Sequence, residues 1–337
     1  MALFQLNTVL CALLLSSNFL GFCVGVDTLL PNQTIVDGQT LISENQVFEM
    51  GFFSPGKSRN RYLGIWYRST PDVVVWVANR DEPIPDSGEV FLAIASNRTI
   101  VISRGGRVIW STDSSGVAAS PVLQLLDIGN LVLVDRRNES SAQDCIWQSF
   151  DYPTDTWLPG MKMIDDIDAG VENYMISWKD WDDPSSGDYV FRIGNHGLPQ
   201  TLILRGTKKR FRAGHWNGLY FGGTPPFPNR IFKPEMIFKG EKLISMLDPY
   251  DSSILKRVTV DNSGMLYLYI MNARKDKWNI ASVYPRDPCD EYSQCGPYGI
   301  CRIDRAIRCE CFTGFTLNPS KIGTFKIGPM DALELGR

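Results

Sequence analysis

The strongest constraint on this 337-residue chain is a cluster of cysteines near its C-terminal end. The cluster runs from Cys289 to Cys311 with the spacing C-x5-C-x5-C-x7-C-x-C, and no cysteine lies between Cys145 and Cys289. Cysteines this dense, in a chain with an apolar leader, are typical of a small disulfide-stapled module in a secreted protein. A zinc site would show two C-x2-C pairs instead. Because the cluster holds an odd number of cysteines, we expect the module to be incomplete.

The leader lies at the N-terminus. Residues Val9 to Leu20 are almost wholly apolar, and small residues around Gly25 suit cleavage there, although no basic residue precedes the apolar run. This run is too short to span a membrane, so residues 1–25 are predicted to be a signal peptide that takes Cys11 and Cys23 with it. Three N-x-S/T sequons, which are acceptors for N-linked glycans in secreted proteins, support this prediction. They begin at Asn32, Asn97 and Asn138.

Charge and composition exclude several classes of partner. The net charge of −3 argues against nucleic acid, which needs a basic face. The hydrophobic content of 44% and the charged content of 21% are ordinary for a globular protein and argue against wholesale disorder. No apolar run of membrane length follows the leader. We therefore expect a secreted globular chain with no membrane span.

Residues 26–150 have the pattern of β-strands throughout. Short runs of Val, Ile, Leu, Phe and Trp alternate with turn-forming clusters such as 54–56 and 104–106. A loose repeat of strand, turn and strand ends three times in a tryptophan, at Trp66, Trp110 and Trp147. The repeat predicts three small sheets, each contributing an indole to one shared core. We expect these indoles, and Trp76, to be core residues rather than ligand platforms.

The rest of the chain divides into three parts. Residues 151–284 repeat the same style of short strands, after a turn-rich linker at 151–156, and predict a second, more divergent β domain. Residues 285–319 form the cysteine module, and residues 320–337 are expected to be a disordered tail.

Several longer motifs resemble one family, the plant S-domain receptor-like kinases and S-locus glycoproteins. Those similar to its bulb-type lectin domain are F-F-S-P-G at 52–56, R-Y-L-G-I-W-Y at 61–67, V-W-V-A-N-R at 75–80, G-N-L-V-L at 129–133 and W-Q-S-F-D-Y-P-T-D-T at 147–156. Those similar to its S-locus glycoprotein region and EGF-like module are W-N-G at 216–218 and C-D-x4-C-G-P-Y-G-x-C at 289–301.

The resemblance implies an all-β fold of two tandem β-prism II (bulb-type lectin-like) domains followed by a small disulfide-stapled EGF-like module. In the family a PAN/apple domain, a transmembrane helix and a cytosolic Ser/Thr kinase follow. This sequence has no glycine-rich phosphate loop, H-R-D loop or D-F-G triplet. We therefore expect no catalytic residue, metal or cofactor, and we interpret the chain as a truncated product or a secreted ectodomain fragment.

The EGF-like pattern implies which cysteines pair. The first is joined to the third and the second to the fourth, which gives Cys289–Cys301 and Cys295–Cys309. Each bond closes a short loop and is worth about 3 kcal/mol in a module with little core of its own. Two candidates for unpaired thiols remain, Cys145 and Cys311. They could pair with each other, pair between chains or stay reduced.

Bulb-type lectins bind mannose through Q-x-D-x-N-x-V-x-Y, whose polar side chains reach the sugar hydroxyls from one strand face. The frame laid on Asn130 and Val132 has apolar residues elsewhere, namely Leu126, Ile128 and Val134. The frame laid on Val101 keeps only the valine, with Ala95, Asn97, Thr99 and Ser103 at its other positions. Apolar residues leave sugar hydroxyls unsatisfied, so Asn130 and Val132 are interpreted as a degenerate remnant, with weak or no mannose binding.

One basic cluster stands out in the second β domain. Because the family's variable ligand-contacting surface lies in this domain, the cluster is a candidate patch for steering an acidic peptide, and the alternative is a solvated hairpin tip. Its members are Arg205, Lys208, Lys209, Arg210 and Arg212.

The resemblance finally implies a function. We expect an extracellular recognition module, active in pollen recognition of the self-incompatibility type or in defence. It would bind a secreted peptide or protein, which could be cysteine-rich, and would associate with like or unlike receptor ectodomains in the apoplast. Full-length relatives would act at the plasma membrane. The alternative is a secreted mannose-type lectin.

Overall fold

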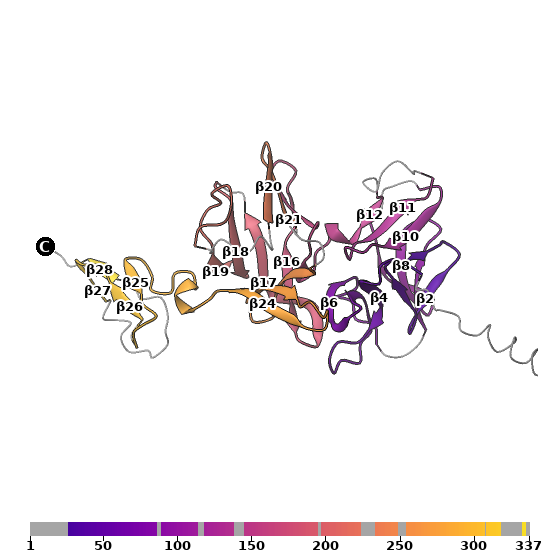
Figure 1. Ribbon diagram of the computed structural model, residues 1–337, viewed down its shortest axis with the longest axis horizontal. Helices are drawn as coiled ribbons and strands as arrows, with labels where there is room; N and C mark the ends of the chain where they lie inside the picture. Colours follow the sequence, from indigo (N-terminus) through magenta and orange to yellow (C-terminus); the bar gives the residue numbers. More distant parts are fainter. Residues whose placement is uncertain are drawn as a thin grey trace, which may run out of the picture.

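The computed structural model describes residues 26–85, 89–113, 118–137, 145–194, 197–223, 233–248, 254–306, 308–317 and 332–334. The predicted signal peptide and the sequon at Asn138 lie outside these ranges. Figure 1 shows three parts in a row along the chain: two units of strands and a small C-terminal module.

The first unit consists of three four-stranded antiparallel sheets. Sheet I has the order β1 (Thr28–Leu29), β10 (Pro121–Leu125), β11 (Leu131–Asp135), β12 (Trp147–Gln148). Sheet II has the order β2 (Thr34–Val36), β7 (Val90–Ile94), β8 (Ile100–Arg104), β9 (Arg107–Ser111). Sheet III has the order β3 (Thr40–Ile42), β4 (Phe48–Phe53), β5 (Tyr62–Tyr67), β6 (Thr70–Val77). Alternate residues of each strand face a common core, which is the period that a half-buried strand imposes.

Three indoles meet at the centre of this unit, one from each sheet. The ring centroids of Trp76, Trp110 and Trp147 lie 6.0–6.3 Å apart, and each pair of rings meets edge to face at 66–76°. Edge-to-face contact sets the positive rim of one ring against the negative face of the next, which stabilises the pair beyond simple burial. The three sheets are thus held together at one point.

The third indole of the cluster is Trp76, and the prediction that sheet III contributes Trp66 was wrong. Trp76 pairs with Ile65 across β5 and β6, so Trp66 points to the opposite face of sheet III. There the Trp66 ring lies 6.1 Å from the ring of Phe53. Trp66 is still buried, as expected, but it takes no part in the central cluster.

The second unit also consists of three four-stranded antiparallel sheets. Sheet IV has the order β13 (Thr156–Trp157), β22 (Lys256–Val260), β23 (Leu266–Met271), β24 (Trp278–Tyr284). Sheet V has the order β15 (Val171–Glu172), β14 (Lys162–Asp166), β21 (Lys242–Asp248), β20 (Lys233–Lys239). Sheet VI has the order β16 (Met175–Asp180), β17 (Asp183–Gly194), β18 (Gln200–Arg205), β19 (Lys208–Arg212).

The two units share the topology of two of their three sheets, whereas sheet II joins one early strand to three later ones and sheet V joins two early strands to two later ones. The first strand of each unit pairs beside its last three strands, in sheets I and IV, and four consecutive strands form sheets III and VI. The fold is therefore two tandem β-prism II units, although other rings meet in the second. There Phe211 contacts Tyr284 at 5.6 Å, while the Trp278 ring lies 4.7 Å from Tyr67 of the first unit.

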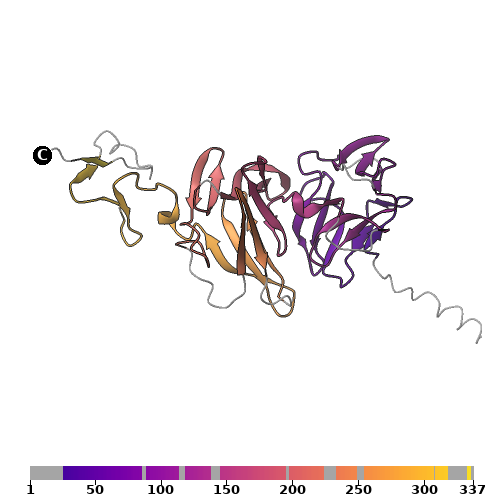
Figure 2. The ribbon, with the colours of Figure 1, turned by 90° about the horizontal axis from the view of Figure 1, so that it is seen from above.

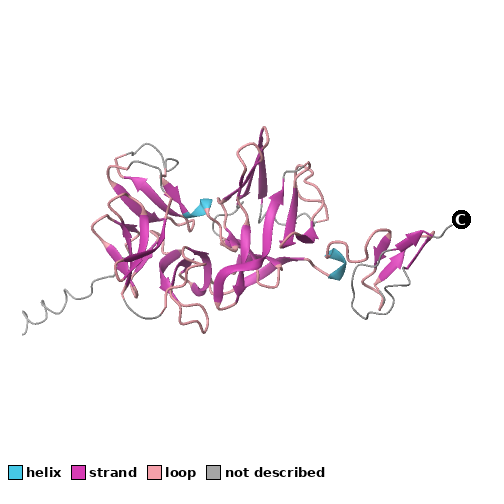
Figure 3. Ribbon diagram, turned by 180° about the vertical axis from the view of Figure 1, so that it is seen from behind, coloured by secondary structure: helices cyan, strands magenta, loops and turns pink. Residues whose placement is uncertain are grey.

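The two units are joined by buried polar contacts around Arg80. Its guanidinium donates to the carbonyl oxygens of Pro184 (2.8 Å) and Ser177 (2.8 Å), with a further bond to Ile176 (3.1 Å), although Arg80 belongs to the first unit. A short 3-10 turn, η2 (Ser149–Asp151), links the units, and Figures 2 and 3 show the two side by side about it.

Asp155 lies in the same joint. It is buried, and its carboxylate faces the positive charges of Arg80 and Arg257. Burial raises the pKa of Asp155 to about 6, while the two guanidinium groups oppose that rise. Burial likewise lowers the pKa of Arg80 and of Arg257, so the three groups form one buried charged cluster.

The C-terminal module is short of core and rich in turns. It contains η3 (Pro288–Asp290) and two hairpins, β25 (Gly299–Cys301) with β26 (Cys309–Cys311) and β27 (Phe315–Leu317) with β28 (Ala332–Glu334). The expectation of a disordered tail over 320–337 was wrong for β28, because these three residues pair with β27. The other residues of that tail lie outside the described ranges.

The indole cluster generates a stability prediction. Trp147→Ala should lower the free energy of unfolding by about 3–5 kcal/mol, because it removes a buried indole and three ring contacts. Trp147→Phe should cost less, since a ring remains at the centre. Denaturant unfolding measures both, and an unchanged midpoint for Trp147→Ala would contradict the central role of the cluster.

The joint generates a pH prediction. The carboxyl of Asp155 has an ordinary pKa of 3.8, against about 6 in the fold, so between these values the folded chain binds more protons. Stability from this group should therefore increase as the pH falls from 7 to 4, by at most about 3 kcal/mol. The measurement is the difference in unfolding free energy between the wild type and Asp155→Asn. Between pH 7 and pH 4 this difference should shift in favour of the wild type by up to that amount. Parallel pH profiles would show that Asp155 does not titrate in this range.

Candidate ligand-binding surfaces

Asn130, the remnant of the first sugar frame, is buried and hydrogen-bonded within the protein. Asn130 begins the turn into β11 and is only 5% exposed. Its amide donates to Oε1 of Gln148 at 2.9 Å, and its Oδ1 accepts from the Ser149 hydroxyl (3.1 Å) and the Phe150 amide (3.2 Å). Val132, two residues on, is also buried. The donor and acceptor capacity that a sugar would use is thus engaged by the end of the same unit.

The frame on Val101 follows β8 of sheet II. Val101 and Ser103 are both less than 10% exposed, whereas Asn97 lies exposed in the turn before the strand. Oδ1 of Asn97 accepts from the hydroxyl of Thr99 at 2.8 Å. The polar groups that remain in this frame therefore belong to its turn rather than to its strand.

A third position of the same kind escaped the sequence analysis. The amide of Asp261 donates to the carbonyl of Met265 before β23, as Leu126 does to Asn130 and as Ala95 does to Thr99. This shared backbone bond marks a frame in the second unit, and the signal was invisible because no residue of the mannose motif survives there. Its strand positions are Tyr267 and Tyr269, whose rings stack at 5.6 Å.

This third frame is occupied by the chain itself. The Asp261 carboxylate accepts from the amides of Ser263 and Met265, and the Arg257 guanidinium lies 3.9 Å from the centre of the Tyr269 ring. Arg257 is 8% exposed, so its guanidinium is shielded from solvent. There it interacts with the Tyr269 ring and with the buried carboxylate of Asp155 between the two units.

The basic cluster on β18 and β19 is largely engaged by the C-terminal module. Arg210 pairs with Glu291 at 3.1 Å, and its main-chain oxygen accepts from the amide of Tyr292 at 2.6 Å. Lys209 and Arg212 both lie over the Tyr292 ring, at 5.4 and 5.5 Å from its centre. Three of the five cations thus hold the module against sheet VI.

The other two members of the cluster differ. Arg205 is exposed and pairs with Asp188 at 3.0 Å, while Lys208 is exposed at the hairpin tip. Such exposed pairs contribute little to stability. A steering role for the cluster stays a prediction, and it now rests on these two side chains together with the exposed faces of Lys209 and Arg212.

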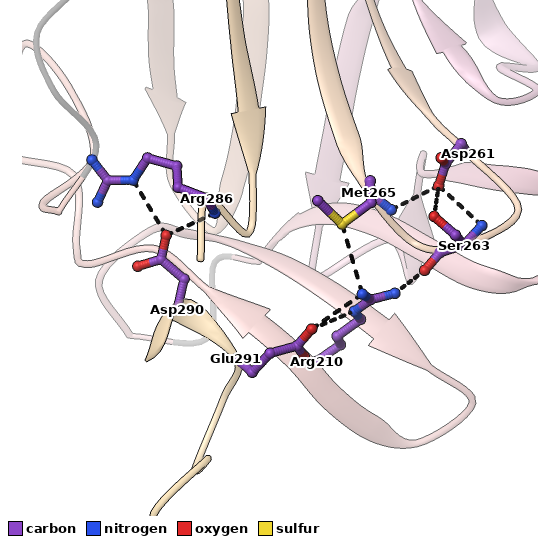
Figure 4. A network of polar contacts seen from close by, with 7 residues as sticks. All are labelled: Arg210, Asp261, Ser263, Met265, Arg286, Asp290 and Glu291. Atoms are coloured by element: carbon purple, nitrogen blue, oxygen red, sulfur yellow. Dashed lines mark hydrogen bonds and ion pairs between the residues drawn. The ribbon is translucent and has the colours of Figure 1, made fainter. Parts of the chain in front are cut away.

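Figure 4 shows how the joint with the module is built. The guanidinium of Arg210 reaches Glu291 on one side and the Ser263 carbonyl on the other, and it also lies 3.7 Å from the Met265 sulfur. The loop of the third frame therefore carries the contact. Nearby, Arg286 donates to Asp290 at 3.2 Å and closes the turn into η3.

The structure joins four cysteines as the resemblance implied, Cys289 to Cys301 and Cys295 to Cys309. Cys311 is half buried at the end of β26 and makes no disulfide within the described residues. Cys145 is half buried just before β12. Because β26 and β12 lie at opposite ends of the molecule (Figure 1), a bond between Cys145 and Cys311 of one chain is excluded.

The described ranges hold no cluster of three or more metal-ligating side chains. None of their helices has the length and hydrophobicity that crossing a bilayer requires.

The joint with the module generates a prediction. Arg210→Ala should weaken it by about 1 kcal/mol, because the Arg210–Glu291 pair is partly shielded from solvent. A loss of this free energy makes the state in which the module is detached about fivefold more populated. Trypsin should therefore cleave after Arg286 roughly fivefold faster. Arg205→Ala is the matched control, since the Arg205–Asp188 pair is exposed and lies outside the joint. Equal cleavage of the two variants would show that Arg210 does not hold the module.

Two protein families match the chain. Residues 73–179 match the D-mannose binding lectin family, and residues 211–319 match the S-locus glycoprotein domain. The domains that match are lectin-type rather than kinase.

Curated relatives match most of the chain. The receptor-like serine/threonine-protein kinase SD1-8 of Arabidopsis thaliana is 36% identical over 305 residues, which covers 88% of this chain and 35% of the relative. The G-type lectin S-receptor-like serine/threonine-protein kinase RKS1 of the same plant is 36% identical, covering 87% and 36%. The S-locus-specific glycoprotein S6 of Brassica oleracea is 36% identical, covering 86% and 66%. The chain thus spans about a third of the length of these kinases and about two thirds of the glycoprotein.

Two solved lectins also align with the chain. A Marasmius oreades lectin has a TM-score of 0.28 and 18% identity, and covers 37% of this chain and 90% of its own. The two-domain Scilla campanulata agglutinin has a TM-score of 0.26 and 10% identity, and covers 74% and 93%. The assignment rests on the sequence matches instead: the chain belongs to the family of S-locus glycoproteins and G-type lectin S-receptor-like kinases, whose lectin-type domains it carries.

Proposed function

We propose that this chain is an extracellular recognition module that binds a secreted peptide or protein. Its relatives are named as receptor-like kinases and as an S-locus-specific glycoprotein, which fits recognition outside the cell. The specific role would be pollen recognition of the self-incompatibility type or defence signalling.

The observation that supports this proposal most is the closed state of Asn130. A sugar site needs free donors and acceptors at the surface, whereas the Asn130 side chain is buried, its nitrogen donates to Gln148 and its oxygen accepts two bonds. The β-prism scaffold remains while its sugar chemistry is used internally. Such a scaffold is suited to recognising something other than mannose.

Exposed apolar side chains in the second unit supply the matching chemistry. Protein interfaces use apolar anchors surrounded by polar residues, whereas sugar sites use rows of hydrogen-bonding groups. Phe238 is 53% exposed on β20, and Leu219 is 76% exposed in the loop after Trp216. Buried contacts hold these units in one arrangement, which reduces the entropy lost when a partner binds.

The sugar test is a titration of the purified chain with mannose and with a mannose-terminated oligosaccharide. We expect no saturable heat of binding in the millimolar range, because neither mannose frame presents its polar set. A saturable signal would support the alternative, a secreted mannose-type lectin, which the match of residues 73–179 favours.

The polypeptide test fractionates secreted peptides from the tissue that expresses the chain. A peptide retained by the immobilised chain is resynthesised and titrated against it, with mannose as competitor. We expect saturable binding that mannose leaves unchanged and that Phe238→Ser or Leu219→Ser weakens at least tenfold, a loss of about 1.4 kcal/mol. Phe312→Ser, an exposed change in the C-terminal module, is the control. Binding that mannose abolishes would overturn the proposal.

A further inference from the structure

The outer face of sheet II carries both apolar and hydroxyl side chains, and its apolar residues at the two edges are exposed to solvent. Val36 pairs with Phe91, Phe91 with Ser103 and Ser103 with Val108, so these four side chains form one row across the sheet. Val36 is 40% exposed at one edge and Val108 is 53% exposed at the other. An exposed apolar surface of this kind in a soluble unit indicates that something covers it.

A second row lies beside the first, toward one end of the sheet. Thr34 pairs with Ala93, Ala93 with Val101, and Val101 with Ser111. The intervening residues, such as Leu92 and Ile102, are fully buried in the core. Strand alternation therefore places both rows on the outer side of the unit.

Both described sequons lie at this end of the face. Asn97 belongs to the turn that joins β7 to β8, where the Ala95 amide donates to the Thr99 carbonyl. Asn32 is two residues before Thr34, which pairs with Ala93, so Asn32 is level with the same turn. Asn32 and Asn97 are both exposed.

Two hydrogen bonds with Thr99 direct the Asn97 side chain toward the outer face of sheet II. Thr99 precedes Val101 by two residues and so shares its side of the sheet, and Oδ1 of Asn97 accepts from the Thr99 hydroxyl at 2.8 Å. The Thr99 amide also donates to Oδ1, at 3.3 Å. Both bonds use the oxygen, which leaves the amide nitrogen, the atom that carries an N-linked glycan, outside them.

We propose that an N-linked glycan on Asn97 lies along the outer face of sheet II and shields its apolar rows. The lipid-diphosphate oligosaccharide of the secretory pathway supplies the sugar. The Asn97 amide nitrogen bonds to C1 of the first N-acetylglucosamine, the bond from C1 to the diphosphate oxygen breaks, and the amide proton is lost as the lipid diphosphate leaves. No oxidation or reduction occurs.

The length of the glycan and its covalent attachment at Asn97 both favour the glycan over a free partner as the group that covers this face. From Thr99 to Ser103 the strand advances about 13 Å, a distance that the first few sugars of the glycan span. The C–H faces of the sugar rings can pack on the exposed parts of Val36, Phe91 and Val108. Because the glycan is covalently tethered at the edge of the face, even weak packing is favoured by a high effective concentration. The chain's own sugar then lies along the strand on which the mannose frame is degenerate.

The test is hydroxyl-radical footprinting of the full chain secreted from plant cells. Glycopeptide mass spectrometry first measures the occupancy of Asn97. Oxidation of Val36, Phe91 and Val108 is then compared before and after enzymatic removal of the glycans from the folded protein. We expect removal to raise oxidation of all three severalfold. Ile280 and Val171 in the second unit, with similar exposure, should not change.

Two variants of one residue separate the glycan at Asn97 from the one at Asn32. Thr99→Ser keeps the sequon and the hydroxyl, so it should match the wild type. Thr99→Ala removes the sequon, so it should show the oxidation of the deglycosylated chain. If Thr99→Ala fails to fold, Asn97→Gln replaces it, because this change removes the acceptor and keeps an amide side chain. An unoccupied Asn97, or equal oxidation with and without the glycan, would overturn the proposal.

Discussion

The contact on which this architecture depends is the burial of the Arg80 guanidinium against main-chain carbonyls of the second unit. A guanidinium offers five donors in a fixed plane, and here several of them are used across the boundary between two separate prisms. A lysine could not reproduce this geometry, because its ammonium is a single point of charge. Since carbonyl positions are fixed by sheet VI, the contact sets the orientation of one unit to the other. Asp155 and Arg257 extend the same buried cluster toward sheet IV.

Sugar recognition and partner recognition place different demands on such a scaffold. Three turns before strands share the backbone bond of the sugar frame, and the chain uses each of the three differently. At Asn130 the amide closes the unit, at Asp261 the loop carries the contact to the C-terminal module, and at Asn97 the polar residues form a sequon. All three turns are used by the protein itself, so we expect a ligand to bind to other surfaces.

Much of this organisation could be predicted from the sequence. The turn clusters and the repeat ending in tryptophan predicted the sheets of the first unit, because a two-residue period and its punctuation are local properties. The choice between Trp66 and Trp76 was not local, since it depends on the register of β5 against β6. The partners of Arg210 were equally hidden, because Glu291 reaches β19 only after the chain has completed the second unit. Nor could the sequence show that Asn130 is engaged, because Gln148 and Ser149 meet it only across sheet I.

The strand order of the two prisms also has a mechanical meaning. In each unit the first and last strands belong to one sheet, β1 with β12 and β13 with β24. A force that stretches the chain between the two ends of a unit would therefore load sheets I and IV and leave the other sheets of each prism outside its path. Under such tension each unit would yield first at the sheet where its chain arrives and departs, while its remaining strands stayed paired.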